Sequence, residues 1–307
     1  MESNKKIFLD TDIGDDIDDA LALIMMLKMG IKVVGISTVF RNTPLRARLT
    51  NKILKMMNID IPVYAGFGKP YTYEVDLNAS FSQYTEELEN DEYKPLNTNP
   101  HKAIDAMIEA CYKYKKDLIV LAIGPYTNLA KAIEKDAVAF TLIDKIVVMG
   151  GCFFEQFIEY NVAMDPEAAA IIFKADLPVH VISADVTWQA QLDDKQTKFI
   201  LDYVDDGSIN GYCSTLLKLW KAHCWFNPVL HDPLAAYYCF DPSICEMTKV
   251  WSEVELSGQI TRGFTANRDH FLKYIEHPLA GKHRILVAKS VDSKRFTDFF
   301  MKVMFDV

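Results

Sequence analysis

The sequence predicts an α/β protein: an open, mixed, mostly parallel sheet flanked by helices, of the Rossmann-like, doubly wound type. Apolar strand-like runs alternate with helical patterns along the whole chain, and this alternation is typical of βαβ units. The early strand candidates are also near-continuous runs of Val, Ile and Leu. Such runs indicate strands that are covered by helices on both faces of the sheet. No internal repeat or Pro-rich linker interrupts the pattern, so we expect a single domain over residues 1–307.

The elements follow from hydrophobic periodicity and from start and stop signals. The predicted strands are 6–11, 32–39, 61–65, 117–123, 145–149, 178–183, 250–256 and 284–288. The predicted helices are 18–29, 44–57, 100–115, 127–135, 165–174, 194–205, 211–223, 232–238 and 293–304. The segment 68–99 is polar and aromatic without a clear period, so we expect a long surface loop or lid there. Neither a G-x-G-x-x-G nor a P-loop motif occurs, which leaves dinucleotide and P-loop functions without support.

Composition narrows the class of protein. Half of the 307 residues are apolar, which suits a globular enzyme with a large core. The net charge of −9 argues against nucleic acid and anionic membrane as partners. The six cysteines form no C-x-x-C pair and indicate reduced thiols. The first residues run into a strand without a signal-peptide pattern, and no apolar run approaches membrane-spanning length, so we expect a cytoplasmic protein.

The most informative segment is the loop that follows the first strand. Six of the ten residues from Asp10 to Asp19 are aspartates. Each pair of carboxylates at this spacing repels by ~1 kcal/mol even in water. A cluster of this kind next to a buried strand needs a cation or bound protons, and all-oxygen ligands favour Ca²⁺ or Mg²⁺. The simpler alternative is a solvated acidic loop, because Asp is favourable at helix N-termini.

Two known motifs can be tested against this loop. An EF-hand counted from Asp10 fails, because Gly14 takes the fifth position and Leu21 the twelfth. A Mg²⁺-dependent phosphatase of the haloacid-dehalogenase type also begins with a strand and Asp-x-Asp. That family has Thr or Val where this chain has Gly14, and it has no use for the later aspartates. It remains as a second interpretation.

In open α/β sheets, ligands bind outside the carboxyl ends of the strands. Unusual residues gather at the predicted strand ends and in two later loops: Asp10 and Asp12, 38–42, 124–128, 149–151, Asp185, 159–161 and 231–235. Each has an ordinary alternative. Gly-Pro and Gly-Gly mark turns, and Asn161, Asp165 and His231-Asp232 fit turns or helix starts.

Taken together, these segments resemble the nucleoside hydrolases, the calcium-dependent N-ribohydrolases with inosine-uridine preference, nearly from end to end. The family's Asp-x-Asp-x-Gly…Asp-Asp-Ala is matched by residues 10–20, and its Gly-Pro-Leu-Thr-Asn-Leu-Ala by 124–130 with Tyr126 for Leu. The remaining matches are Ser37-Thr38-Val39-Phe40-Arg41-Asn42, Pro62 to Gly66, Met149-Gly150-Gly151, Glu159-Tyr160-Asn161, Asp165 to Ala169, Asp185-Val186-Thr187, His231 to Ala235 and Thr261-Arg262-Gly263.

The resemblance implies a role for each matching residue. Asp12, Asp19, Asp232 and the carbonyl of Thr127 would bind Ca²⁺, and Asp12 would also take a proton from the attacking water. Asp18, Asn42, Glu159 and Asn161 would bind ribose hydroxyls, with Tyr160 near the base and His231 as general acid. A carboxylate-lined site suits an N-glycosidic bond that breaks through an oxocarbenium-like state. The resemblance also implies purine or pyrimidine salvage, a small ribonucleoside as partner, and a homodimer or homotetramer.

The chain departs from the family pattern at four places. Its acidic loop is two residues longer, so Asp16 is an alternative to Asp18 as the ribose ligand. Arg41 stands where the family has Gly, and Trp188 where it usually has His. The loop 152–158 is short and lacks a ribose-binding Asn, for which Gln156 or Glu155 could substitute, or the 5′ end of the substrate could differ.

The sequence therefore predicts an enzyme that hydrolyses the N-glycosidic bond of ribonucleosides. Three other interpretations stay open: the phosphatase, a non-catalytic ribosyl-binding protein, and an enzyme of this fold that acts on another ribosyl compound. We also expect aromatic residues of 220–226 to form a flat wall against the base, namely Trp220, His223, Trp225 and Phe226. The alternative is that this stripe belongs to the core.

Overall fold

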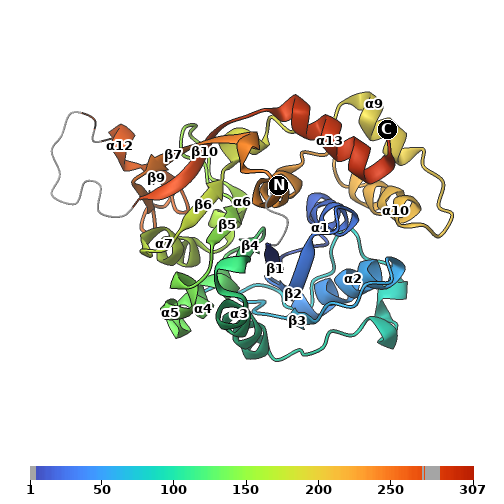
Figure 1. Ribbon diagram of the computed structural model, residues 1–307, viewed down its shortest axis with the longest axis horizontal. Coiled ribbons are helices and arrows are strands. Elements are labelled where there is room, and N and C mark those ends of the chain that lie inside the picture. Colours follow the sequence, from blue (N-terminus) through green and yellow to red (C-terminus); the bar gives the residue numbers. More distant parts are fainter. Residues whose placement is uncertain (1–4, 272, 274–283) are drawn as a thin grey trace.

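The computed structural model describes residues 5–271, 273 and 284–307 (Figure 1). The strands are β1 Lys6–Thr11, β2 Lys32–Thr38, β3 Val63–Ala65, β4 Leu118–Ala122, β5 Lys145–Met149, β6 Val179–Ile182, β7 Cys245–Val250, β8 Ser252–Val254, β9 Thr265–Asn267 and β10 Ile285–Val291. The helices are α1 Asp18–Lys28, α2 Thr43–Met56, α3 Pro100–Tyr114, α4 Thr127–Lys135, α5 Ala137–Thr141, α6 Tyr160–Met164, α7 Pro166–Lys174, α8 Ala184–Thr187, α9 Asp194–Leu201, α10 Ile209–Lys221, α11 His231–Phe240, α12 Arg268–Phe271 and α13 Ser293–Phe305. Short 3₁₀ helices occur at Glu86–Glu89, Asp91–Tyr93, Lys115–Asp117 and Pro242–Ile244.

An eight-stranded sheet organises the molecule, in the order β3-β2-β1-β4-β5-β6-β10-β7. All neighbouring strands run parallel except β7, which pairs antiparallel with β10 at one edge. The predicted mixed, mostly parallel sheet is therefore confirmed. A separate two-stranded sheet joins β8 and β9. The expectation of one domain over residues 1–307 remains a prediction.

Side chains alternate between the two faces of the sheet, as the strand geometry requires. In β1, Ile7 and Leu9 enter one hydrophobic cluster, while Phe8 enters the other. The first cluster packs against α1, α2, α10, α11 and α13, and the second against α3, α4, α5 and α7. Figure 1 shows α3, α4, α5 and α7 gathered on one side and α1, α10 and α13 on the other. Burial on both faces explains why the early strands are continuous apolar runs.

The parallel strands and most predicted helices lie within one or two residues of their predicted ranges, except that β10 ends at Val291 rather than at 288. The predicted strand 250–256 is wrong. Trp251 separates the edge strand β7 from β8, and these strands belong to different sheets. β7 begins at Cys245, five residues before the predicted start. The prediction missed this part because Glu246 and Lys249 are exposed, so the residues do not form an apolar run. The helix predicted over 194–205 ends at Leu201, and α5, α6, α8, α12 and β9 were not predicted.

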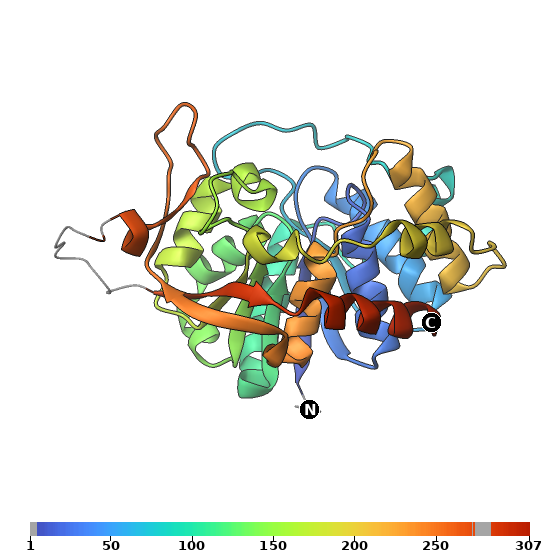
Figure 2. The same cartoon turned by 90° about the horizontal axis from the view of Figure 1, so that it is seen from above.

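The order of the strands places the site. β1 lies between β2 and β4, and the chain leaves β1 toward β2 on one side but reaches β4 on the other. Such a reversal opens a crevice at the carboxyl ends of the two strands. The segment between β3 and α3 (cyan) arches across one side of the molecule in Figure 2. Within the described ranges, no helix is long and apolar enough to cross a bilayer.

Candidate active site

A cavity of about 580 Å³ opens at the crevice between β1 and β4. Of the catalytic, metal-binding and substrate-binding residues predicted from the family motifs, all but Asn42 and Thr127 line it: Asp12, Asp18, Asp19, Glu159, Tyr160, Asn161, His231 and Asp232. These residues come from three separate stretches of the chain, 12–19, 159–161 and 231–232, so only the fold brings them together. The cavity also contains residues that the sequence did not assign, among them Asp15, Arg41 and Trp188.

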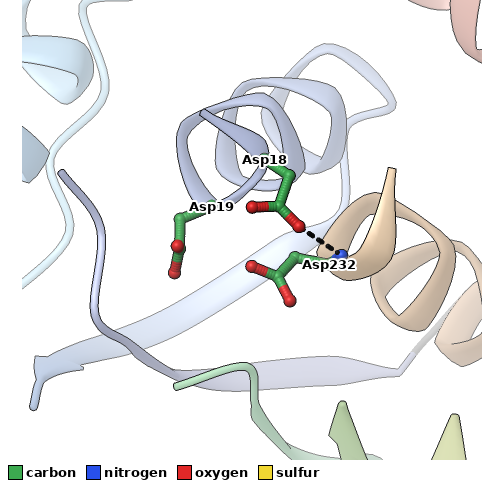
Figure 3. A group of neighbouring side chains, drawn as sticks. All are labelled: Asp18, Asp19 and Asp232. Atoms are coloured by element: carbon green, nitrogen blue, oxygen red, sulfur yellow. Dashed lines mark hydrogen bonds between the residues drawn. The ribbon is translucent and has the colours of Figure 1, made fainter. Parts of the chain in front are cut away.

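Three buried aspartates form the acidic end of the cavity (Figure 3). Asp18 and Asp19 begin α1, and Asp232 lies in the first turn of α11. One carboxylate oxygen from each lies within 4.8 Å of the others, and the Asp232 N–H donates to Asp18 Oδ2 over 3.0 Å. Two helix N-termini therefore face this cluster, and their partial positive charge favours carboxylates.

The electrostatics of these carboxylates show that the cluster needs a counter-charge. Burial raises the pKa of Asp18, Asp19 and Asp232 well above the usual value, and their mutual repulsion raises it further. Burial also raises the pKa of Asp12 to about 7, although Arg46 opposes the shift. Such groups hold protons unless a cation replaces them. An all-oxygen, buried donor set fits a hard divalent cation.

The predicted metal ligands are only partly brought together. Asp19 and Asp232 lie in the cluster, but its third member is Asp18 rather than Asp12. Asp12 lies in the same cavity, and its charge raises the pKa of both Asp19 and Asp232. Thr127 is buried outside the lining of the cavity, and its hydroxyl donates to Asp165 Oδ2 over 2.5 Å. The roles of Asp12 and of the Thr127 carbonyl as ligands stay predictions.

The acidic loop is held by a buried arginine that the sequence analysis missed. Arg46, on α2, is fully buried and donates to the carbonyls of Phe40, Asp12 and Ile13. Its Nη2 also lies 2.6 Å from Asp15 Oδ2. A buried guanidinium needs partners for all its donors, and here the loop supplies them. Arg46 therefore fixes the backbone on both sides of the turn and offsets part of the negative charge.

The loop is fixed from the other side by the segment 81–83. Ser82 Oγ donates to the Asp15 carbonyl, the Gln83 side chain to Asp16, and the Gln83 N–H to Gly14. Gly14 has φ of +125°, and a Cβ there would come within 2.8 Å of the Phe81 ring. Only glycine fits this position. Residues 81–83, in the middle of the predicted 68–99 loop, therefore form a clasp that holds the acidic loop in place.

Glu159 and Asn161 border the cavity at the start of α6. The Glu159 carboxylate accepts hydrogen bonds from the N–H groups of Gly151, Asn161 and Val162. Asn161 Nδ2 donates to the carbonyls of Ile123 and Met149. Both side chains are thus anchored to the ends of β4 and β5 and are held in one orientation. Their predicted contacts with ribose are not tested.

Asn42 does not line the cavity. Its side-chain oxygen accepts a hydrogen bond from the Leu45 N–H and caps α2. A capping oxygen at this position satisfies one of the unpaired N–H groups of the helix. The preceding residue, Arg41, lines the cavity instead. The predicted ribose contact of Asn42 therefore has no support from its position.

Aromatic rings form the end of the cavity next to His231. Trp188, Trp220 and Phe226 line it, and ring contacts connect them to His231. Within the predicted stripe, Trp220 and Phe226 meet edge-on with an interplanar angle of 86°, and Trp225 and Phe226 meet at 84°, so these rings do not form a flat wall. His223 and Trp225 do not line the cavity, and Trp225 is 92% exposed. Trp220 and Phe226 lie there as predicted.

His231 is partly buried at the N-terminus of α11. Burial lowers the pKa of its imidazole to about 4, so the ring is neutral near neutral pH. Its Nδ1 lies 2.6 Å from Thr187 Oγ1. A hydroxyl that donates to Nδ1 leaves the proton on Nε2. A ring in that state still offers one N–H to a ligand.

The short loop 152–158 is held by Asp185. Its carboxylate accepts hydrogen bonds from the N–H groups of Phe153, Phe154 and Glu155. This arrangement turns Glu155 and Gln156 outward, where both are exposed and neither lines the cavity. Phe157 and Ile158 line it instead. The suggested substitution of the missing Asn by Gln156 or Glu155 is therefore not supported.

Comparison with known proteins identifies the family. The model of the inosine-uridine preferring nucleoside hydrolases matches residues 7–298. The chain belongs to the nucleoside hydrolase family. It is therefore a hydrolase that acts on N-glycosyl compounds, and the phosphatase interpretation is not favoured. The resemblance drawn from the sequence motifs is confirmed.

Relatives cover nearly the whole of this nucleoside hydrolase. A probable uridine nucleosidase 2 from Oryza sativa subsp. japonica is 27% identical, covering 99% of this chain and 94% of its own. The pyrimidine-specific ribonucleoside hydrolase RihA of Shewanella sp. (strain ANA-3) is 28% identical over 85% of this chain and 86% of its own.

Solved structures show the same fold. A plant nucleoside hydrolase, the PpNRh1 enzyme, superposes with a TM-score of 0.81 at 26% identity, covering 98% of this chain and 99% of its own. A purine-preferring ribonucleoside hydrolase from Gardnerella vaginalis gives a TM-score of 0.77 at 28% identity, covering 98% of each chain. The named relatives thus include both pyrimidine and purine enzymes.

Proposed function

We propose that the cavity binds a ribonucleoside and hydrolyses its N-glycosidic bond to free base and ribose. The observation that carries this proposal is the arrangement of the cavity. Buried carboxylates, anchored polar side chains and a neutral histidine with aromatic rings line the same cavity. A ribose placed at the carboxylates would direct its base toward His231 and Trp188.

The carboxylates suit the chemistry of the sugar. Cleavage of an N-glycosidic bond builds positive charge on the anomeric carbon and ring oxygen. Asp12, which lines the cavity beside the acidic cluster, would accept a proton from the attacking water. Asp18 would accept the hydrogen bond of a ribose hydroxyl. It lies in the buried cluster, whereas Asp16 is only half-buried, so Asp18 is the better placed of the two.

We propose Ca²⁺ as the cation of the cluster, held by Asp19 and Asp232 with Asp12 and the Thr127 carbonyl. The all-oxygen donors and the excess of buried negative charge support this choice, because Ca²⁺ accepts six to eight oxygen ligands. A bound divalent cation would lower the pKa of a water molecule in the cavity. The protein's own part is to keep the carboxylates buried and fixed, through Arg46 and the clasp at 81–83.

We propose that His231 assists the leaving base. A neutral imidazole with its proton on Nε2 would donate a hydrogen bond to a departing ring nitrogen, and full proton transfer would require the imidazolium form. The rings of Trp188, Trp220 and Phe226 would offer apolar contact to a base at this end of the cavity. Selectivity from such contacts is modest. The relatives include uridine, pyrimidine and purine enzymes, so similarity alone does not select the base.

Release of free ribose from a panel of nucleosides tests the proposal. Inosine, adenosine, uridine, cytidine and nicotinamide riboside would be incubated with the wild type in calcium, with Asp12→Asn as the inactive variant. Asp117→Asn is a matched control, because Asp117 is exposed and distant from the cavity. We expect ribose from at least one nucleoside with the wild type and the control. Binding of nucleosides without any ribose release would instead favour the non-catalytic interpretation.

We also propose a cytoplasmic homodimer or homotetramer that takes part in nucleoside salvage. This part rests on the family and on the composition of the chain. Light scattering of the purified protein measures the oligomeric state, and a monomer would contradict it.

A further inference from the structure

Arg41 is a half-buried cation in the lining of the cavity. Within the part of the chain that the structure describes, its guanidinium makes no hydrogen bond and no ion pair. It lies over the ring of Phe40, at 5.2 Å from the centroid, and its charge acts on the nearby hydroxyls of Tyr160 and Tyr73. A guanidinium carries five N–H donors and keeps its charge at any physiological pH. These donors are therefore available to a ligand in the cavity.

The backbone at this position is also unusual. Arg41 has φ of +56° and Phe40 has φ of +66°, both in the left-handed region that glycine occupies without cost. The loop keeps this shape because the N–H groups of Phe40 and Arg41 donate to the carbonyls of Phe67 and Gly68. Residues held in such conformations cluster at ligand sites, where the side chain serves a purpose. An arginine at a position that suits glycine thus indicates a use for its side chain.

Two separate groups of rings lie at the cavity besides the acidic cluster. The first consists of His231, Trp188, Trp220 and Phe226, connected by ring contacts. In the second, Arg41 stacks on Phe40, whose ring meets Tyr160 at 6.4 Å. Among the described residues no ring contact joins the two groups.

A bound ribonucleoside would contact both groups, one with its base and the other with its 5′ group. The base leaves the sugar at C1′ and the 5′ group leaves it at C4′, on either side of the ring oxygen. With the hydroxyls of C2′ and C3′ at the carboxylates and the base at His231, the 5′ group would extend toward Arg41. The loop 152–158 offers this end only Phe157 and Ile158, because Glu155 and Gln156 are turned outward. Arg41 is the one Lys or Arg side chain among the described residues of the lining.

We propose that Arg41 determines specificity by binding an oxygen at the 5′ end of the ribosyl substrate. The inference rests on the proposed function, since it places the base at His231. The oxygen acceptor could belong to a free 5′-hydroxyl or to a 5′-phosphate. The carboxylates of Asp12, Asp15 and Glu159 in the same cavity repel a phosphate dianion. We therefore expect the hydroxyl.

The experiment compares three substrates that differ only at the 5′ position. These are the nucleoside that the wild type cleaves best, its 5′-deoxy analogue and its 5′-monophosphate. The variants are Arg41→Gly, which suits the backbone conformation, Arg41→Lys, and Lys69→Met as a control. Lys69 is an exposed cation paired with Glu74 and does not line the cavity.

A hydrogen bond to a charged group predicts a loss of about 10- to 100-fold in kcat/KM when the 5′-hydroxyl is removed from the substrate. Arg41→Gly should lose the same factor on the nucleoside but little on the 5′-deoxy analogue, so that its discrimination disappears. Arg41→Lys should keep part of the discrimination, and Lys69→Met all of it. A preference for the 5′-monophosphate that disappears in Arg41→Gly would also support the proposal and assign the acceptor as phosphate.

Two failures are distinguishable. If the wild type releases ribose from none of the substrates, the proposed function fails. If the wild type is active but Arg41→Gly keeps its discrimination, or loses equal activity on the nucleoside and its 5′-deoxy analogue, only the role of Arg41 is overturned.

Discussion

Removing one carboxylate from the acidic cluster should have opposite effects on stability with and without calcium. Asp19 is 4% exposed, and the charges of Asp12 and Asp18 raise the pKa of its carboxyl group. The substitution Asp19→Asn keeps the shape of the side chain and removes one of these repelling charges. We expect the variant to be more stable than the wild type in a chelator and less stable in excess calcium.

The magnitude follows from the raised pKa values. The pKa of Asp12 rises from 3.8 to about 7 on folding. Each pKa unit corresponds to about 1.4 kcal/mol, so full ionisation of this group in the folded, cation-free protein lowers the free energy of unfolding by up to about 4 kcal/mol. Because the cluster shares its protons, removal of one charge should recover only part of this, about 1–3 kcal/mol. Calcium at about 100 times its dissociation constant would add about 2.7 kcal/mol to the wild type. Each kcal/mol shifts the Tm of a chain of this size by about 2 °C.

The pH dependence has a definite sign. A carboxyl group whose pKa is raised by folding holds its proton more tightly in the folded than in the unfolded chain. Such a group therefore does not reduce the free energy of unfolding below its unfolded pKa of about 4. The reduction grows as the pH rises toward the folded pKa, which is about 7 for Asp12. The metal-free wild type should lose stability as the pH rises from about 4 to about 7, and calcium should remove most of that loss.

Thermal unfolding in chelator and in calcium, across this pH range, measures all of these quantities. Asp117→Asn, at an exposed position, is the control and should follow the wild type throughout. The reasoning is refuted if calcium leaves the Tm of the wild type unchanged. It is also refuted if Asp19→Asn is less stable than the wild type in the chelator at about pH 8.

Three further substitutions test the catalytic and base-binding assignments. Asp12→Asn should lower kcat by about 10²–10⁴-fold while circular dichroism shows an intact fold, and an unchanged kcat would remove Asp12 from the mechanism. His231→Ala should impair purine nucleosides far more than nitrophenyl riboside, whose leaving group needs no proton, whereas equal losses would show that His231 only packs. Trp220→Ala should raise KM for inosine and uridine, while Trp225→Ala, at an exposed position, should leave both unchanged. A Trp220→Ala variant with unchanged kinetics would place that ring in the core alone.

The sequence predicted the central strands because their environment is uniform. β1, β4 and β5 are buried on both faces, so nearly every residue carries the same apolar signal. The edge strand β7 has no such signal, since it exposes Glu246 and Lys249. Its position depends on pairing with β10, about forty residues later in the chain. Pairing over that distance leaves no local pattern to read.

The site was predictable where the chain itself places a residue at the end of a strand. Asp12 lies in the loop that follows β1, and His231 is the first residue of α11, so the position of each follows from the adjoining element. Arg46 was not predictable, because it sits inside an ordinary helical pattern and its partners are backbone carbonyls of another segment. The displacement of Asn42 has a similar cause. Its side chain caps α2 locally, and this contact competes with any contact across the cavity.

The clasp on the acidic loop connects the stability of the site to its chemistry. Repulsion among the carboxylates would spread a free loop apart, and an isolated loop would place its ligands at variable distances. Arg46 from α2 and Gln83 from the segment after β3 instead hold the carbonyls between Asp12 and Asp16. These hydrogen bonds keep the loop from moving to relieve the repulsion, so the repulsion lowers the stability of the whole fold instead. A cation that enters the cluster meets carboxylates already in position, so little of its binding free energy is spent on ordering the site.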